Sequence, residues 1–200
     1  MRIIAGRLGS RALVAPPGMA TRPTSDRLRE TLFNVLAPRM EGARFLDLYA
    51  GSGAVGIEAL SRGAALVEFV ERAPAALKVL RENLERLELR AGFGIHAMAV
   101  GAFLRRAGAA GAGAERYDLV FLDPPWDAGE EYAATLGLLG GNAAGLLAAD
   151  AVVIAEHRRK ERLEERYGRL KRSRLLEQGD AGLSFYGVSE EAKLRLEEEP

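Results

Sequence analysis

An acidic residue followed by closely spaced glycines is the first group of residues that suggests ligand binding. The segment Asp47-Leu-Tyr-Ala-Gly51-Ser-Gly53-Ala-Val-Gly56 runs from an apolar stretch into a helical pattern. Glycines at such a turn adopt positive φ and let the backbone approach a ligand at the start of the next helix. Glu71 follows the next apolar stretch, at the spacing typical of an acid that binds ribose hydroxyls. The pattern predicts a nucleoside-bearing cofactor.

The charge at Asp47 separates the two cofactors that this pattern fits. A carboxylate at the strand end disfavours the pyrophosphate of NAD, whereas it favours the cationic amino group of S-adenosylmethionine. We therefore expect S-adenosylmethionine to bind at Asp47, Gly51, Gly53 and Glu71. An NAD-dependent oxidoreductase that uses the same glycines and Glu71 remains the alternative from another class.

A second group, Asp123-Pro124-Pro125-Trp126, follows an apolar stretch that reads as a buried strand. Consecutive prolines have fixed φ and no amide donors, so the chain leaves the sheet stiffly with the Pro124 carbonyl available as an acceptor. This carbonyl and the Asp123 carboxylate are suited to accept both hydrogens of an exocyclic base amine, and Trp126 is suited to stack on the base. We expect these four residues to be catalytic. Transfer of an activated methyl group needs alignment more than a strong base, so no metal site is expected.

Arginine dominates the beginning of the chain. Residues 1–40 contain seven arginines against two acidic residues, Asp26 and Glu30. Arginine side chains hold nucleic acids mainly through phosphates, which position the partner without reading its sequence. The residues predicted to contact RNA are Arg7, Arg11, Arg22, Arg27 and Arg29.

Short apolar stretches alternate with helical patterns from residue 44 onward, and this order predicts parallel strands with helical crossovers. The expected strands cover 45–49, 66–70, 94–99, 118–122 and 152–156, and the expected helices cover 54–62, 74–88 and 130–147. Stretches 169–176 and 183–188 flank a turn-rich linker and predict an antiparallel hairpin. The predicted fold is a Rossmann-like three-layer α/β sandwich with a mostly parallel seven-stranded sheet and a C-terminal antiparallel hairpin.

The patterns also predict how the chain is divided. Apolar runs at 2–5 and 11–15 around a glycine-bearing loop predict an N-terminal β-hairpin, and a helix is expected over 25–37. We therefore expect an RNA-contacting appendage at 1–40, a methyltransferase core at 41–188 and an acidic tail at 189–200. The Ala/Gly-rich stretch 107–114 is expected to be a loop.

In combination, the motifs resemble those of a known family. Asp-Pro-Pro followed by an aromatic, downstream of Asp-x-x-x-Gly-x-Gly, resembles the amino-methyltransferases with the class I Rossmann-like fold. The opening, Met1-Arg-Ile-Ile-Ala-Gly and Arg22-Pro-Thr-Ser-Asp-Arg-Leu-Arg-Glu-Thr-Leu-Phe-Asn34, is similar to that of the bacterial 16S rRNA guanine-N2 methyltransferases of the RsmD type. The resemblance covers residues 1 to about 188.

The resemblance implies roles for the motif residues. Asp47, Gly51 and Gly53 would hold the methionine part, Glu71 the ribose hydroxyls, and Asp123 through Trp126 the guanine amine. The chain departs from the pattern at Ala99, where such enzymes usually carry Asp or Asn to read the adenine amino group. We expect backbone groups, in particular those of Val100, to read adenine instead.

The expected activity is methyl transfer from S-adenosylmethionine to the exocyclic N2 of a guanine in 16S rRNA. The partner would be ribosomal RNA or an assembly intermediate of the small ribosomal subunit, and the protein would act as a monomer. An adenine-N6 or cytosine-N4 nucleic-acid methyltransferase fits Asp-Pro-Pro-Trp equally well, but the chain has no room for a separate target-recognition domain, which favours RNA. An RNA-binding protein without activity is a further alternative.

Composition bears on the compartment and on other chemistries. The chain has no cysteine, so disulfides, thiolate zinc sites and thiol nucleophiles are excluded. No apolar run approaches the roughly 20 residues that cross a bilayer, and the first residues reach charge too soon for a signal peptide. We expect a cytoplasmic protein without membrane contact, and structural roles for His96 and His157.

Overall fold

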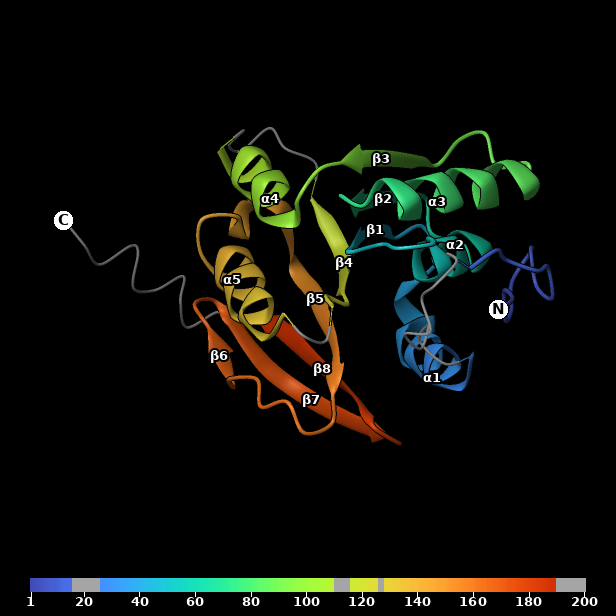
Figure 1. The fold of residues 1–200 in the computed structure, drawn as a ribbon. Helices are drawn as coiled ribbons and strands as arrows, with labels where there is room; N and C mark the ends of the chain where they lie inside the picture. Colours follow the sequence, from blue (N-terminus) through green and yellow to red (C-terminus); the bar gives the residue numbers. More distant parts are fainter. Residues whose placement is uncertain (16–25, 110–115, 126–127, 190–200) are drawn as a thin grey trace. The chain divides into compact units, whose positions relative to one another are not determined.

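A computed structural model describes residues 1–15, 26–109, 116–125 and 128–189. The chain divides into two compact units, an N-terminal unit, Met1–Ala99, and a C-terminal unit, Val100–Pro200. Each unit contributes its own strands and helices (Figure 1). Within the described ranges, no helix combines the length and the apolar character that a bilayer crossing requires.

The N-terminal unit is built on three parallel strands in the order β3-β2-β1. Its elements are α1 (Asp26–Leu36), a 3-10 turn (Ala37–Arg39), β1 (Arg44–Leu48), α2 (Ala54–Ser61), β2 (Leu66–Glu71), α3 (Pro74–Arg86) and β3 (Phe93–Ala97). All three strands and the helices α1, α2 and α3 lie where the sequence predicts them. The parallel register aligns Asp47 with Phe69, so β1 and β2 end at the same edge of the sheet.

The N-terminal segment folds back on itself as predicted, although its arms are too short to count as extended strands. The arms share an isolated antiparallel bridge, Arg2 with Ala12. Backbone hydrogen bonds also join them, from the Ile3 N–H to the Arg11 carbonyl at 3.0 Å and from the Leu13 N–H to the Met1 carbonyl at 3.1 Å. Other backbone groups of the segment find partners in α2. Glu58 accepts the N–H groups of Ile4 and Ala5 at 2.7 and 3.0 Å, and the Ser61 hydroxyl accepts that of Leu8 at 3.0 Å. Backbone pairing between the arms and these side chains of α2 together supply the hydrogen bonds that the segment requires.

The C-terminal unit contains five strands in the order β4-β5-β8-β7-β6. Its elements are α4 (Val100–Ala109), β4 (Tyr117–Leu122), α5 (Gly129–Gly140), a 3-10 turn (Ala144–Leu146), β5 (Leu147–Arg158), β6 (Arg166–Tyr167), β7 (Leu170–Gln178) and β8 (Ala181–Val188). β4 and β5 are parallel, whereas β8 pairs antiparallel with both β5 and β7. The predicted C-terminal antiparallel hairpin is confirmed, with Gly179 at φ +60° in its turn.

Several details of the C-terminal unit differ from the sequence prediction. Residues 107–109 belong to α4 instead of a loop, while 110–115 lie outside the described residues, and β5 begins at Leu147 instead of residue 152. The described residues form eight strands in all rather than seven, because the two-residue strand β6 is too short to leave a periodic signal. Helix α5 ends at Gly140 instead of residue 147, because Gly140 and Gly141 interrupt the helix. Figure 1 shows α4 and α5 on one side of the unit's strands. Tyr132 of α5 ties this layer to β5 by donating to the Glu156 carbonyl at 3.0 Å.

Candidate active site

The turn between β1 and α2 is sharply bent. Tyr49, Gly51 and Gly53 have φ values of +60°, +57° and +80°. The left-handed conformation costs glycine nothing, whereas for a bulky residue such as Tyr49 it stores strain of about 1–3 kcal/mol. Such strain persists where the surrounding structure holds it, and it concentrates at functional sites.

The three glycines of the motif meet different needs. A Cβ at Gly53 would lie 2.3 Å from a Leu80 methyl carbon, and one at Gly56 would lie 2.3 Å from the Phe69 ring. Both glycines therefore allow α2 to pack closely within the protein. A Cβ at Gly51 would meet only the Tyr49 carbonyl oxygen, at 3.9 Å. Gly51 is the position of the turn where space for a ligand remains.

Asp47 is buried at the end of β1, with 1% of its surface exposed. Its Oδ2 accepts the Gly56 N–H at 2.9 Å, which ties the strand end to the first turn of α2. Burial raises the pKa of Asp47 to about 7, the Gly56 hydrogen bond opposes this shift, and the charge of Glu71 adds to it. A cation placed nearby would restore the ionised carboxylate.

Glu71 lies half-buried at the end of β2 and reaches the glycine turn. Its Oε2 accepts the Gly51 N–H at 2.9 Å, and its Oε1 accepts the N–H groups of Arg72 and Ala73 at 2.8 and 2.7 Å. The structure thus brings together Asp47, Gly51, Gly53 and Glu71, as the motif spacing predicts. Ribose binding by Glu71 and amine binding by Asp47 stay predictions.

Asn83 of α3 is a residue at this site that the sequence prediction missed. Its side chain is 1% exposed, and its Nδ2 donates to the Ser52 carbonyl of the glycine turn at 3.0 Å. The same amide forms a pair of hydrogen bonds with Val14, accepting its N–H at 2.8 Å and donating to its carbonyl at 3.1 Å. The sequence signal that could have identified Asn83 is an asparagine on the apolar face of a predicted helix. Asn83 joins the N-terminal segment to the glycine turn.

The second motif leaves the carboxyl end of β4. Asp123 is half-buried, Pro124 is buried and Pro125 is exposed. The Pro125 carbonyl accepts the Ala128 N–H at 2.8 Å, while the Pro124 carbonyl has no donor among the described residues. Amine capture by the Pro124 carbonyl stays a prediction. Trp126 lies outside the described residues.

The position expected to read adenine lies where β3 gives way to α4. Ala99 is exposed, and Val100 is the first residue of α4 with its side chain 4% exposed. The first N–H groups of a helix lack partners within the helix. Adenine recognition by the Val100 backbone stays a prediction, and it would use the N–H rather than the side chain.

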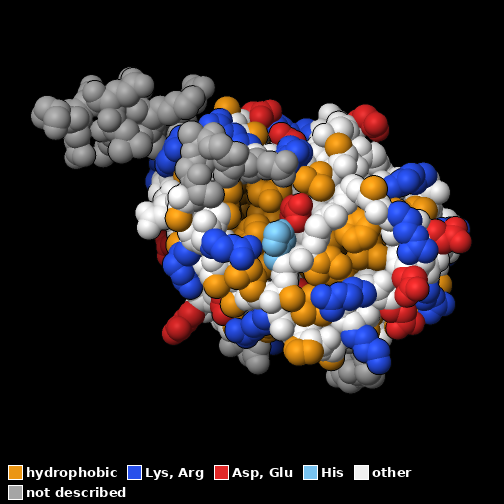
Figure 2. Space-filling view, turned by 90° about the horizontal axis from the view of Figure 1, so that it is seen from above, with side chains coloured by type: hydrophobic (Ala, Val, Ile, Leu, Met, Phe, Trp, Pro, Cys, Tyr) orange, Lys and Arg blue, Asp and Glu red, His pale blue; other side chains and the backbone are white. Residues whose placement is uncertain are grey.

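The predicted RNA-contacting arginines separate by exposure. Arg7 and Arg11 are exposed and donate to the carbonyls of Leu60 and Leu87, at 3.4 and 3.2 Å. Arg27 is exposed on α1, and Arg22 lies outside the described residues. Figure 2 shows basic side chains interspersed with acidic and hydrophobic ones across the visible face. Phosphate contact by these exposed arginines stays a prediction.

The prediction that Arg29 contacts RNA is wrong. Arg29 is 0% exposed, and its guanidinium bonds to the Asp26 carboxylate at 3.0 Å and to the Arg2 carbonyl. Its Nε also lies 3.8 Å from Glu58 Oε2. Buried charges require such partners, because an unpaired ion is costly away from water. Arg29 holds α1 to the N-terminal segment and is not presented to RNA.

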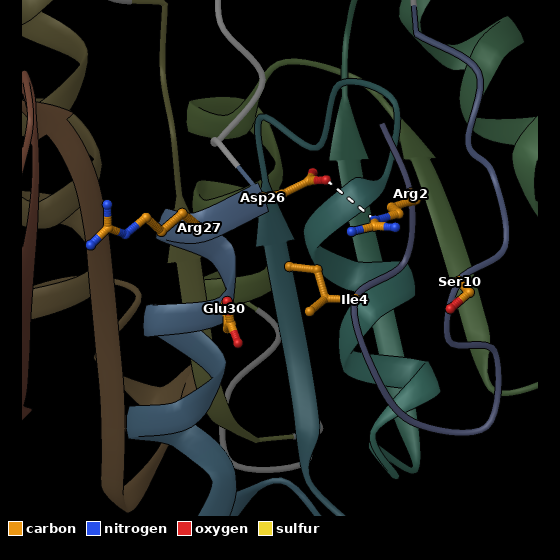
Figure 3. Close-up of a pocket in the computed structure, with 6 residues that line it drawn as sticks. All are labelled: Arg2, Ile4, Ser10, Asp26, Arg27 and Glu30. Carbon is orange, nitrogen blue, oxygen red and sulfur yellow. Dashed lines mark ion pairs between the residues drawn. The ribbon is translucent and has the colours of Figure 1, made fainter.

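A pocket of about 350 Å³ lies between α1 and the N-terminal segment, apart from the glycine turn (Figure 3). It is lined by Arg2, Ile4, Ser10, Asp26, Arg27 and Glu30. Arg2 and Asp26 form an ion pair at 3.8 Å across it, and Figure 3 shows Arg27 pointing away from the other labelled residues. The pocket contains none of the residues expected to hold the cofactor.

Comparison with known proteins identifies the family. Residues 1–187 match the family described as "Conserved hypothetical protein 95". The chain belongs to this family. This is the RsmD-type family that the motifs resemble.

Two curated relatives support the assignment. "Putative rRNA methyltransferase YlbH" of Bacillus subtilis is 38% identical over 187 residues, which cover 93% of this chain and 98% of that protein. "Ribosomal RNA small subunit methyltransferase D" of Escherichia coli K12 is 40% identical over 158 residues, covering 78% of this chain and 74% of the relative. The chain therefore matches most of the length of both.

Solved structures share the fold. "Putative methyltransferase yhhF from Escherichia coli" superimposes with a TM-score of 0.80 at 32% identity, covering 94% of this chain and 98% of that one. A hypothetical protein of Thermus thermophilus, TTHA0928, gives a TM-score of 0.77 at 33% identity, with coverages of 94% and 99%. The predicted Rossmann-like α/β fold class is confirmed. As a member of this family, the chain is an S-adenosylmethionine-dependent methyltransferase.

Proposed function

We propose that this protein transfers a methyl group from S-adenosylmethionine to the exocyclic N2 of a guanine in 16S rRNA. The observation that carries the proposal is the Asp123-Pro124-Pro125 exit from β4, in a family whose curated members are named as rRNA methyltransferases. The glycine turn braced by Asp47 and Glu71 supports cofactor binding in the same chain.

The residues of the second motif would orient the amine. The Asp123 carboxylate and the Pro124 carbonyl accept its two hydrogens, which leaves the nitrogen lone pair directed away from both. When bound, S-adenosylmethionine supplies an electrophilic methyl group on a sulfonium, so orientation contributes more than base strength. Trp126 would stack on the ring, a contact worth about 1–3 kcal/mol.

The glycine turn would hold the methyl donor. Gly51 leaves room beside the backbone, and the first N–H groups of α2 give the turn a positive end. Glu71, whose carboxylate accepts the Gly51 N–H of the turn, would also accept hydrogen bonds from ribose hydroxyls. Asp47 would pair with the cationic amine, and the Val100 N–H would read adenine.

The substrate of such an enzyme must expose the guanine. A base stacked in a stem is out of reach of Asp123, so the target lies in a loop or is flipped out of its stack. We propose that the protein acts as a cytoplasmic monomer on ribosomal RNA, either free or in an assembly intermediate of the small subunit.

Incubation of the purified protein with labelled S-adenosylmethionine tests the proposal. The acceptors are 16S rRNA and small subunits from a strain that lacks the enzyme, followed by nucleoside analysis of the product. N2-methylguanosine at one position is the expected product, and comparison of the two acceptors identifies the preferred substrate. N6-methyladenosine or N4-methylcytidine would refute the guanine assignment, and no methylation of either acceptor would refute the rRNA activity.

A further inference from the structure

A run of basic residues begins at the last residue of β5, the strand that pairs with β4. Arg158, Arg159, Lys160 and Arg162 are basic, and Glu161 is the only acidic residue among positions 158–162. β4 and β5 are parallel, with Leu122 aligned to Ala155. Both strands therefore leave the sheet at the same edge, which is where α/β sheets bind their ligands.

The surroundings of α5 bring charges of this run and of the Asp-Pro-Pro motif to the same helix. Burial raises the pKa of Tyr132 above its ordinary value, the charges of Asp123 and Glu161 add to the rise, and Arg158 opposes it. A Cβ on Gly129, the first residue of α5, would lie 3.7 Å from Glu161 Oε1. Asp123 and the 158–162 run therefore surround the same helix start.

Backbone hydrogen bonds fix the turn that carries these side chains. The Arg159 N–H donates to the Asp180 carbonyl at 2.7 Å, and the Glu161 N–H donates to the Arg158 carbonyl at 2.9 Å. The turn is therefore anchored to the end of the β7–β8 hairpin. A fixed backbone lowers the conformational entropy that the basic side chains lose when they bind a partner.

The basic groups of this turn face solvent. Arg159, Lys160 and Arg162 are exposed. Arg159 pairs with Glu177 at 3.1 Å, but both side chains are substantially exposed, so water screens the pair. Lys160 and Arg162 have no ion-pair partner within the part of the chain that the structure describes. Their positive charge is available to an anionic partner.

We propose that the 159–162 loop binds RNA phosphates next to the target nucleotide, through Lys160 and Arg162 with support from Arg159. The inference rests on the proposed function, because the RNA on either side of a base held at Asp123 must pass along the same sheet edge. Phosphate contacts by lysine and arginine supply affinity and set the register of the RNA. The loop therefore adds a contact surface in the C-terminal unit to the basic N-terminal segment.

The double variant Lys160→Ala/Arg162→Ala tests this surface. The matched control, Lys171→Ala/Arg174→Ala, removes the same charge from exposed positions of β7. Lys171 is aligned with Gly187, which is itself aligned with Val152, so it lies toward the opposite edge of the sheet. Binding to a 16S rRNA fragment is measured at several salt concentrations, together with methylation kinetics and S-adenosylmethionine affinity.

The test variant should reduce the slope of log affinity against log salt by about 1.5, as expected when two phosphate contacts are lost. KM for RNA should rise with little change in kcat, and the control should keep the wild-type slope. A test variant with wild-type slope and KM would overturn the inference, as would an equal loss in the control. If the variant weakens RNA binding but the wild-type protein methylates neither acceptor, the proposed function is wrong while RNA binding by the 159–162 loop is supported.

Discussion

The carboxylates at the two strand ends of the N-terminal unit brace the glycine turn. Asp47 accepts from Gly56 on one side of the turn, and Glu71 accepts from Gly51 on the other. Motif spacing predicts both acids at this turn. It does not predict that their carboxylates already accept hydrogen bonds from backbone N–H groups of the turn. If the cofactor binds here as proposed, it exchanges or adds to existing hydrogen bonds, and its affinity should depend on the protonation of the buried acid.

Asp47 should make the affinity for S-adenosylmethionine depend on pH. With its pKa near 7, the side chain is mostly protonated at pH 6 and mostly ionised at pH 7.5. If only the ionised form pairs with the cofactor amine, affinity should rise by up to about eightfold over this interval. Calorimetric titration of wild type and Asp47→Asn measures this. The variant should bind more weakly with a flat profile, and a flat wild-type profile would remove Asp47 from amine binding.

His157 should make stability depend on pH. The ring is buried, its Nδ1–H donates to the Arg158 carbonyl, and its Nε2 accepts from the Ser184 hydroxyl at 2.9 Å. Burial lowers the pKa of His157 below its ordinary value of 6.5. The stabilisation is fully present above pH 6.5 and is lost as the pH falls below it, because the unfolded state binds the proton more readily.

Thermal unfolding of wild type and His157→Gln between pH 7.5 and pH 5 tests this linkage. The melting temperature of the wild type should fall more steeply with acidification than that of the variant. The same slope in both proteins would show that protonation of His157 does not couple to unfolding.

At the scale of elements, the positions of strands, helices and turns could be predicted from the sequence. Contacts between residues far apart in the chain could not. The glycine turn, the Asp-Pro-Pro exit and the C-terminal hairpin follow from apolar periods and turn residues, and the structure places them accordingly. The pairing of the two N-terminal arms also follows from the sequence, but the hydrogen bonds that Glu58 and Ser61 make to that segment from more than 50 residues away could not be predicted. Arg29 was misassigned for a related reason, since charge in a sequence does not reveal burial.

Asn83 couples the N-terminal segment to the glycine turn, and its replacement should affect both. Asn83→Ala leaves the Val14 N–H and carbonyl and the Ser52 carbonyl without their partner. Val14 and Ser52 are half-buried, so the total cost should be about 1–3 kcal/mol of stability. S-adenosylmethionine affinity should fall as well, because the turn loses a brace. Glu82→Ala is the control, since its exposed pair with Arg86 at 3.5 Å contributes little.

Calorimetric titration and thermal unfolding of both variants provide the readouts. If Asn83→Ala binds the cofactor as tightly as Glu82→Ala does, Asn83 supports the N-terminal segment alone. Asn83→Asp keeps the acceptor for the Val14 N–H but loses the donors to the Val14 and Ser52 carbonyls, and its buried carboxylate would face both carbonyl oxygens. It should therefore be destabilised at neutral pH and bind the cofactor less well.

At the scale of the whole molecule, equal numbers of basic and acidic residues, 28 of each, hide local excesses. The N-terminal 40 residues and the 159–162 loop are basic, and Figure 2 shows both signs intermixed on the visible face. Affinity for RNA should therefore come from a limited number of positioned contacts. It should weaken steadily with salt, because each phosphate contact releases a counterion.

Arg27 and Glu30 of α1 offer a comparison at this scale. Both are exposed and line the same pocket. Arg27→Ala should flatten the salt dependence of RNA binding by about one unit, as expected for one phosphate contact. Glu30→Ala should leave the slope unchanged. An Arg27 variant with the wild-type slope would show that α1 does not contact phosphate there.

The central claim is that the Asp-Pro-Pro exit from β4 captures a guanine amine while the glycine turn binds the methyl donor. Single-turnover methylation of 16S rRNA by Asp123→Ala, with S-adenosylmethionine affinity measured on the same preparation, tests it most directly. The rate of N2-methylguanosine formation should fall by about 100-fold or more, the usual effect of losing one positioned polar group, while cofactor affinity stays close to wild type. Methylation at the wild-type rate by Asp123→Ala would contradict the account.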